Sequence, residues 1–135
     1  MATFTKFQPF VENVAEKVFN LGSDQLVVAL TNTAPTNTFS TLSQITEISY
    51  TNCSSRNITT TSSAQTSGTY KLVLADLVLT ASGTVGPFRY IVIYDDTAAS
   101  DQLIASYDYG SAITLASGDT FTIDFDASTG FLTIA

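Results

Sequence analysis

Apolar and polar residues alternate, or apolar residues form short unbroken runs, along most of the chain after residue 24. Alternation is typical of a strand with one buried face, and a short apolar run is typical of a strand covered on both faces. The segments with these patterns are 25–32, 58–65, 70–75, 77–81, 88–94, 103–109, 113–115, 120–126 and 131–134, with a weaker candidate at 45–50. Turn-forming residues separate them at intervals of about ten residues, which predicts an antiparallel β-sandwich or barrel.

Three of these segments have more specific patterns. In 88–94 both alternating sets are apolar, so this strand is predicted to be central and covered on both faces. Segment 58–65 is rich in Thr and Ser and is predicted to be an exposed edge strand. A turn at 116–119 is predicted to join 113–115 to 120–126 as a hairpin. The residues of that hairpin predicted to face the core are Phe121, Ile123 and Phe125.

Only the first part of the chain has a helical pattern. Pro9 suits a first helical position, and Gly22 suits the left-handed residue that ends a helix. The apolar residues between them recur at spacings of three and four: Phe10, Val11, Val14, Val18 and Leu21. This pattern predicts a helix over residues 9–21. The arm before it, residues 2–8, is predicted to dock either on its own chain or on a partner, because its aromatic side chains need a surface.

The charge balance excludes some classes of partner. Lys and Arg number 5 against 12 Asp and Glu, for a net charge of −7. The cations are scattered along the chain: Lys6, Lys17, Arg56, Lys71 and Arg89. Nucleic acids and anionic membrane surfaces require clustered cations, so neither is a predicted partner. The length of 135 residues predicts a single domain, with the arm and helix over about residues 1–21.

The residue types needed for catalysis are scarce. The chain has no histidine and one cysteine, Cys53, which excludes a Cys–His nucleophile, a zinc site and an internal disulfide. A reducing compartment therefore fits the chain better than secretion, and no secretory leader or membrane span is predicted. The acidic loop 95–101 is interpreted as a solvated surface, with an ion site or an acid–base pair as the alternative. The sequence predicts no enzyme activity, no metal and no cofactor.

Arg89 lies within the apolar segment 88–94. A cation in such a strand is predicted to pair with an Asp of its own chain, or alternatively to reach a partner protein. Four tyrosines occur in this part of the sequence: Tyr90, Tyr94, Tyr107 and Tyr109. We expect them to serve core and interface packing, with stacking on sugars as the alternative.

Four segments, taken in order, resemble small head proteins of tailed bacteriophages. They are FTKFQPFVENVAEKVFNLGSDQLVVALTNTAPT (4–36), SSAQTSGTYKLVLAD (62–76), GPFRYIVIYDDTAASDQLIASYDYG (86–110) and SGDTFTIDFDASTGFLTIA (117–135). The family that these segments resemble is the capsid decoration, or cement, proteins. The resemblance covers most of the chain and is one of overall pattern, since none of the four segments is a catalytic motif.

The resemblance implies an all-β fold, an antiparallel jelly-roll-like β-sandwich with one short N-terminal helix. It also implies a dimer or trimer that bridges major capsid protein subunits on the capsid exterior, after assembly in the host cytoplasm. The residues predicted to contact the capsid protein or another copy are Phe4, Phe7, Phe10, Arg89, Tyr90 and Tyr94. The alternatives are a tail or neck component and a carbohydrate-binding β-sandwich for host attachment.

Overall fold

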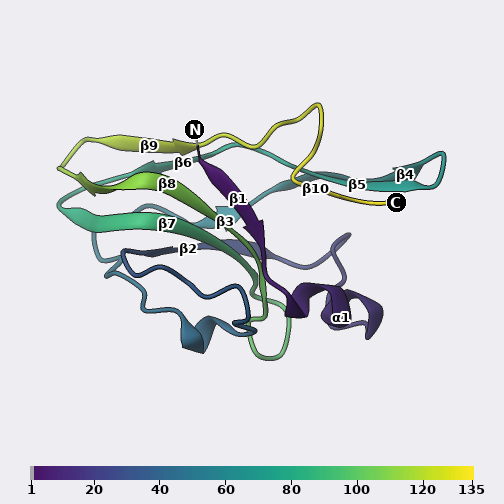
Figure 1. Cartoon of the computed structure of the whole chain (residues 1–135). Helices are drawn as coiled ribbons and strands as arrows, with labels where there is room; N and C mark the ends of the chain where they lie inside the picture. The colour runs from purple at the N-terminus through teal and green to yellow at the C-terminus, as the bar shows by residue number, and fades with distance from the viewer. Residues whose placement is uncertain (1) are drawn as a thin grey trace.

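Antiparallel strands dominate the computed structural model, which describes residues 2–135 (Figure 1). The strands are β1 (Thr3–Lys6), β2 (Leu26–Thr31), β3 (Asn57–Ile58), β4 (Thr60–Thr66), β5 (Thr69–Leu74), β6 (Leu77–Thr80), β7 (Val85–Asp95), β8 (Leu103–Leu115), β9 (Thr120–Ile123) and β10 (Leu132–Ile134). The helical elements are α1 (Pro9–Ala15) and a 3₁₀ turn, η1 (Leu42–Gln44). Over residues 2–135 the fold is therefore mainly β with one short α-helix near the N-terminus, as the sequence predicts.

The strands of residues 2–135 form three antiparallel sheets. The largest has the order β1-β8-β7-β2-β3, and the smaller two have the orders β10-β5-β4 and β6-β9. Figure 1 shows the two smaller sheets following one another above the large sheet. They adjoin because only two residues separate the end of β5 from the start of β6. The smaller sheets together therefore cover one face of the large sheet.

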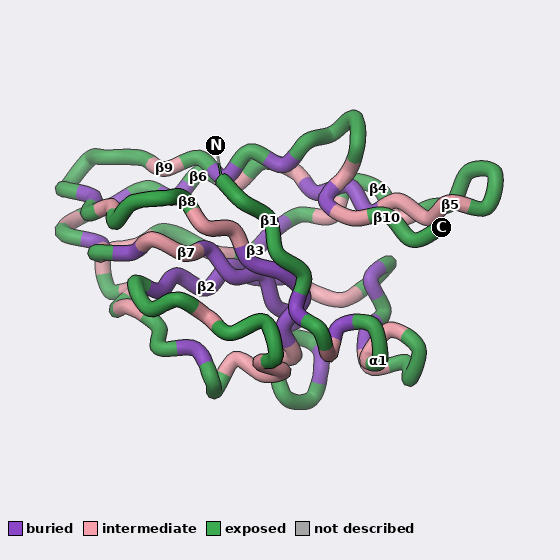
Figure 2. Tube along the Cα trace, in the orientation of Figure 1, coloured by how far each residue is buried: buried purple, intermediate pink, exposed green. Residues whose placement is uncertain are grey.

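Apolar side chains cover the large sheet on both faces. Toward the smaller sheets, the main core includes Leu26, Val28, Leu30, Leu72, Leu74, Leu79, Ile91, Ile93 and Ile123. On the opposite face, a second cluster contains Phe7, Val27, Ala29, Ile45, Val92, Tyr94 and Leu103. This confirms the prediction that 88–94 is a strand covered on both faces. It also explains why every residue of β2 is buried (Figure 2).

Residues 45–50 do not form the weaker strand that the sequence predicts. β3 pairs with only the first two residues of β2, so the rest of that β2 edge needs other hydrogen-bond partners. The Leu30 carbonyl accepts a hydrogen bond from the Ile48 N–H at 3.0 Å, and the Leu30 N–H donates to the Tyr50 hydroxyl at 2.9 Å. That hydroxyl in turn donates to Glu47 at 2.7 Å. Irregular backbone and the Tyr50 hydroxyl therefore provide the hydrogen bonds of this β2 edge, and no neighbouring strand is needed there.

The N-terminal arm docks on its own chain. It forms β1, which pairs antiparallel with β8 at one edge of the large sheet. Phe7 comes directly after β1 and is 1% exposed in the second core cluster, whereas Phe4 remains 43% exposed. The structure therefore shows the arm docked on its own chain, which is one of the two predicted alternatives.

Helix α1 ends at Ala15, six residues earlier than the sequence predicts. The left-handed residue after it is Lys17, with a φ of 65°, and not Gly22. The apolar spacing continues past the helix because the following irregular chain also contributes to the core. Phe10 of the helix stacks on Phe19 of this chain, with ring centroids 5.5 Å apart.

Strand β8 is continuous over 13 residues, although the sequence predicts separate segments at 103–109 and 113–115. Gly110 lies within it at a φ of 99°, which a glycine adopts without strain. On the neighbouring strand β7, Gly86 has a φ of 113°, and a Cβ there would lie 2.6 Å from the Ile113 carbonyl oxygen. β7 and β8 therefore stay paired through two glycine positions that interrupt the strand pattern in the sequence.

The predicted hairpin between 113–115 and 120–126 is not formed. β9 pairs with β6 along its whole length, so the turn at 116–119 carries the chain from the large sheet to a smaller one. Ala81, directly after β6, fixes this turn: its N–H donates to the Asp119 carbonyl at 2.9 Å, and its carbonyl accepts from the Gly118 N–H at 2.7 Å. The inward-facing pattern of 120–126 is nevertheless correct, because Ile123 and Phe125 lie in the main core.

Candidate binding groove

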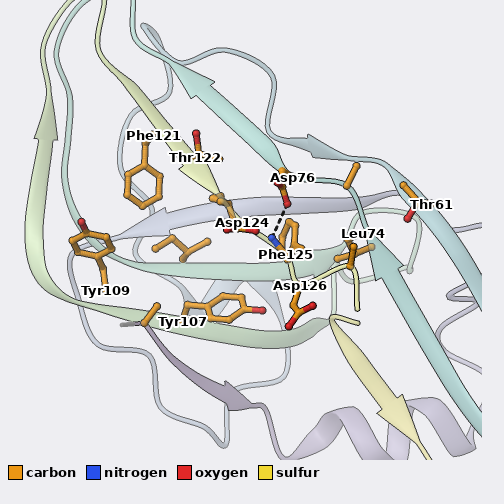
Figure 3. A pocket seen from close by; sticks show the side chains of 15 residues that line it. Thr61, Leu74, Asp76, Tyr107, Tyr109, Phe121, Thr122, Asp124, Phe125 and Asp126 are labelled. Carbon is orange, nitrogen blue, oxygen red and sulfur yellow. Dashed lines mark hydrogen bonds between the residues drawn. The ribbon is translucent and has the colours of Figure 1, made fainter. Parts of the chain in front are cut away.

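A groove of about 1180 Å³ opens between β8 of the large sheet and the layer that contains β9 (Figure 3). Side chains from both layers line it. Tyr107 and Tyr109 come from β8, whereas Phe121 comes from β9 and Phe125 from the segment after it. The Tyr109 and Phe121 rings meet edge to face at 5.6 Å between centroids. One end of the groove therefore has an aromatic wall, and Tyr109 is 46% exposed there.

Tyr107 presents a free hydroxyl to the groove. Its ring packs between aromatic neighbours, with centroids 5.4 Å from Phe4 and 6.4 Å from Phe125. Burial raises the pKa of this phenol to about 12, so the hydroxyl keeps its proton at neutral pH. Figure 3 shows the ring directed along the groove, and no group of residues 2–135 forms a hydrogen bond with its hydroxyl. A bound molecule that offers a polar atom would satisfy this hydroxyl.

Three carboxylates, Asp76, Asp124 and Asp126, line the groove and give it an acidic character. Asp76 accepts a hydrogen bond from the Phe125 N–H at 2.9 Å. Asp126 accepts from the N–H of Ser128 and of Thr129, and these bonds hold its pKa below the usual range. No Lys or Arg is among the described residues that line the groove. The groove can therefore accept hydrogen bonds and attract cations, while its aromatic residues contact apolar or planar groups.

Two strand edges beside the groove lack a partner strand. β1 covers β8 only from Ala105 to Asp108, so one side of β8 is uncovered beyond that residue. β9 pairs with β6 on one side and with no strand of residues 2–135 on the other. Uncovered edges present backbone N–H and C=O groups that an additional strand can pair with. The groove therefore lies beside backbone that can accept an extended chain.

The six predicted contact residues do not form one site. Phe7, Phe10 and Tyr94 pack inside the monomer, where they contribute to its two core clusters. Phe4, at the surface, packs edge to face on Tyr107 and Phe131 beside the groove. The structure therefore keeps three of the six away from any surface, and a contact role remains a prediction for the residues nearer the surface: Phe4, Arg89 and Tyr90.

Arg89 pairs with an Asp of its own chain, as the first of the two sequence alternatives predicts. Its Nε and Nη2 donate to the two carboxylate oxygens of Asp108 at 2.8 and 3.1 Å. The two charged side chains remain partly exposed, so little desolvation cost opposes their pairing. Solvent screens such a pair, so its contribution to stability is small. The Arg89 Cζ also lies 5.3 Å from the Tyr90 ring centroid, within the range of a cation–π contact.

The acidic loop 95–101 is not solvated at its first residue, contrary to the sequence interpretation. Asp95 is 0% exposed, and its Oδ1 accepts hydrogen bonds from the N–H of Thr97 at 2.9 Å and of Ala98 at 3.1 Å. Burial, and then the nearby Asp24 carboxyl, raise the pKa of Asp95 to about 7. Its Oδ2 has no hydrogen-bond partner, and a proton held on this oxygen could be donated to the nearby Asp24 carboxyl. Residues 2–135 contain no cluster of three or more candidate metal ligands.

The sequence indicates parts of the groove but not the groove itself. Tyr107 and Tyr109 stand out as candidates for stacking on sugars, and Phe121 and Phe125 as inward-facing residues. What sequence reasoning misses is that β9 pairs with β6, which places these two pairs on opposite sides of an opening. Tyr107 and Tyr109 are two residues apart and therefore lie on the same face of β8. This spacing is the sequence signal that groups the two tyrosines.

Comparisons with protein-family models, with curated proteins and with solved structures find no match for this chain. Among residues 2–135, no helix is both long and apolar enough to cross a membrane.

Proposed function

We propose that this protein is a non-enzymatic structural protein of a tailed-bacteriophage virion, which binds the outside of the capsid and bridges major capsid protein subunits. The sequence resemblance in four ordered segments supports this role. The surface chemistry supports it as well, because about a quarter of the residues are Ser or Thr and only 13% are charged. Hydroxyl groups cost less to desolvate than charges, so such a surface is suited to burial against another protein.

The observation that carries the proposal is the groove beside two uncovered strand edges. A neighbouring chain in extended form pairs its backbone with such an edge, while its alternate side chains enter the adjoining groove. In our proposal this segment belongs to the major capsid protein. The acidic lining formed by Asp76, Asp124 and Asp126 favours a segment that carries Lys or Arg.

The proposal includes a jelly-roll arrangement of the two layers and a small oligomer, a dimer or trimer. A jelly roll pairs most strand edges within the fold and leaves only some edges for contacts. Repeated weak contacts on an icosahedral shell add up through avidity, so each single groove need not bind tightly. The acids of the groove act as hydrogen-bond acceptors in this role, and two of them already accept from backbone N–H groups.

Replacing Tyr109 with serine is expected to weaken binding to capsids about tenfold, because a half-exposed aromatic side chain that becomes buried contributes about 1.4 kcal/mol. The matched control is Val78→Ser on β6, since Val78 is 50% exposed and lies outside the groove lining. Co-sedimentation of each purified variant with capsids prepared without the protein gives the affinity. Equal binding by the wild type and by Tyr109→Ser would remove the groove from the proposal.

The number of copies in purified virions tests the location. Decoration of a shell requires on the order of hundreds of copies, whereas a tail or neck component is present in about six to twelve, as ring symmetry dictates. Quantitative mass spectrometry of virions, with the major capsid protein as the internal reference, measures this ratio. A ratio in the lower range would assign the protein to the tail or neck.

Carbohydrate binding is the second candidate, and the free Tyr107 hydroxyl favours it. Sugar rings stack on exposed aromatic faces such as Tyr109, and their hydroxyls donate to carboxylates such as Asp124. A glycan array separates the two candidates. Consistent binding to neutral glycans that Tyr109→Ser abolishes, together with unchanged capsid binding, would assign the groove to host attachment instead of the shell.

A further inference from the structure

Strand β4 is the longest uncovered edge of the two smaller sheets. It lies at the end of the order β10-β5-β4, and its only ladder is the one with β5. Five of its seven residues are exposed to solvent, and only Thr60 and Ser63 are half-buried. Figure 1 shows the β4–β5 hairpin extending past the rest of the molecule. No second strand of residues 2–135 pairs with β4, although the chain at Gly22 comes near the Ser63 side chain.

Four of the other uncovered edges, those of β1, β3, β9 and β10, have features that discourage pairing between molecules. β3 has two residues and β10 has three, which is too short for a useful ladder. β1 ends in Lys6, and β9 lies between Asp119 and Asp124. Charged side chains and short strands are the usual means by which proteins protect a sheet edge.

β4 has none of these protections over most of its length. From residue 57 to residue 70 the chain contains no charged residue and no proline. The pairing of β4 with β5 is regular from Ser62 to Thr66, where the hairpin turns at Ser67 and Gly68 with φ angles of 51° and 84°. Alternate residues of a regular antiparallel strand direct their N–H and C=O groups away from the partner strand. From Ser62 to Thr66 the edge is therefore regular, uncharged and without a partner strand.

We propose that β4 pairs antiparallel with β4 of a second copy across a two-fold axis, which joins two three-stranded sheets into one sheet of six strands. A second copy is the occupant that charge favours. The chain carries a net charge of −7, so most surfaces of two copies repel one another, whereas this segment brings no charge to the contact. Cross-strand pairs of Thr and Ser are favourable in antiparallel ladders, and here each strand supplies both partners.

Two-fold pairing also closes the assembly. An isologous contact uses the same edge on both copies, so no unpaired β4 edge remains to recruit a third. The expected product is a dimer and not a trimer or a fibre. This inference does not depend on the proposed function, because it concerns an edge on a different sheet from β8, although Thr61 of β4 also lines the groove.

Sedimentation velocity tests the pairing in the full chain. The wild type, at 14.4 kDa per chain, is expected to sediment as a dimer at about 0.1 mM and to dissociate on dilution. Ala64→Lys places two like charges close to the axis and should raise the dissociation constant at least about tenfold. Ala99→Lys, at an exposed position of the loop after β7, adds the same charge elsewhere and should leave the dimer intact.

Hydrogen exchange supplies an independent readout. In the wild type, the β4 amides are expected to become protected as the concentration rises, while those of Ala64→Lys stay unprotected in a protein that still melts cooperatively. A wild type that remains monomeric at about 0.5 mM would overturn the proposal. A trimer, or a dimer that survives Ala64→Lys, would overturn it equally.

Discussion

Phe7→Ala is expected to lower the free energy of unfolding by about 3–5 kcal/mol, the usual cost of removing a fully buried phenylalanine side chain. Phe7 is 1% exposed and fills the second core cluster, where it packs with residues of β2, β7 and β8. Its backbone N–H also donates to the Ile104 carbonyl at 3.1 Å, which holds the end of β1 against the large sheet. The truncation therefore leaves a cavity that a hydrogen-bonded backbone cannot collapse to fill.

Phe4→Ala is the matched control, because the same substitution is made three residues earlier in the same arm. Phe4 is 43% exposed and makes only edge-to-face contacts, so its loss should cost about 1 kcal/mol. Urea unfolding of both variants, followed by far-UV circular dichroism, measures the difference. Equal and small effects would mean that the arm does not contribute to the core and that Phe7 is free to serve a partner.

Asp95→Asn is expected to remove a large dependence of stability on pH. Asp95 has a pKa of about 7 in the folded protein against 3.8 for an unperturbed Asp, so the folded state holds a proton that the unfolded state has lost. Its contribution to stability is therefore complete below about pH 4 and is lost as the pH rises through 7. The loss amounts to about 1.4 kcal/mol for each pH unit in that window.

Asparagine reproduces the protonated form of this residue. Its Oδ1 can accept the hydrogen bonds from Thr97 and Ala98, and its Nδ2 can donate to Asp24 in place of the shared proton. The variant should match the wild type near pH 4 and exceed it by a few kcal/mol at pH 8. Asp96→Asn, at the exposed neighbouring position, is the control and should follow the wild type. Parallel stability curves for the wild type and Asp95→Asn between pH 4 and 8 would show that the two acids do not share a proton.

Local periodicity predicts the individual strands more successfully than their pairing. The all-apolar pattern of 88–94 identifies the centre of the large sheet, because only a strand covered twice needs both faces apolar. The pattern of 113–126 suggests a hairpin because a short turn usually joins neighbouring strands. Here β9 turns away from β8, since its hydrogen bonds are made with β6, more than 40 residues earlier in the chain. A one-dimensional pattern contains no information on such a choice.

Two further differences have the same origin in long-range contacts. The continuity of β8 depends on Gly110 and on its partner strand, although the local sequence resembles a break. The raised pKa of Asp95 depends on its burial and on Asp24, which lies just before strand β2. The candidate groove was predictable only as separate aromatic residues, because its shape results from the separation of β8 and β9.

Ala2 lines the groove, and this position determines which end of the chain is better suited to a fused domain. A passenger domain fused ahead of Ala2 starts beside the opening and obstructs whatever enters it. A passenger fused after Ala135 starts beyond β10, which lies at the opposite edge of its sheet from β4. Figure 1 places the start of β1 and the end of β10 apart, so the C-terminal attachment leaves both the groove and the β4 edge accessible. A fusion to this protein should therefore carry its passenger domain on the C-terminal side.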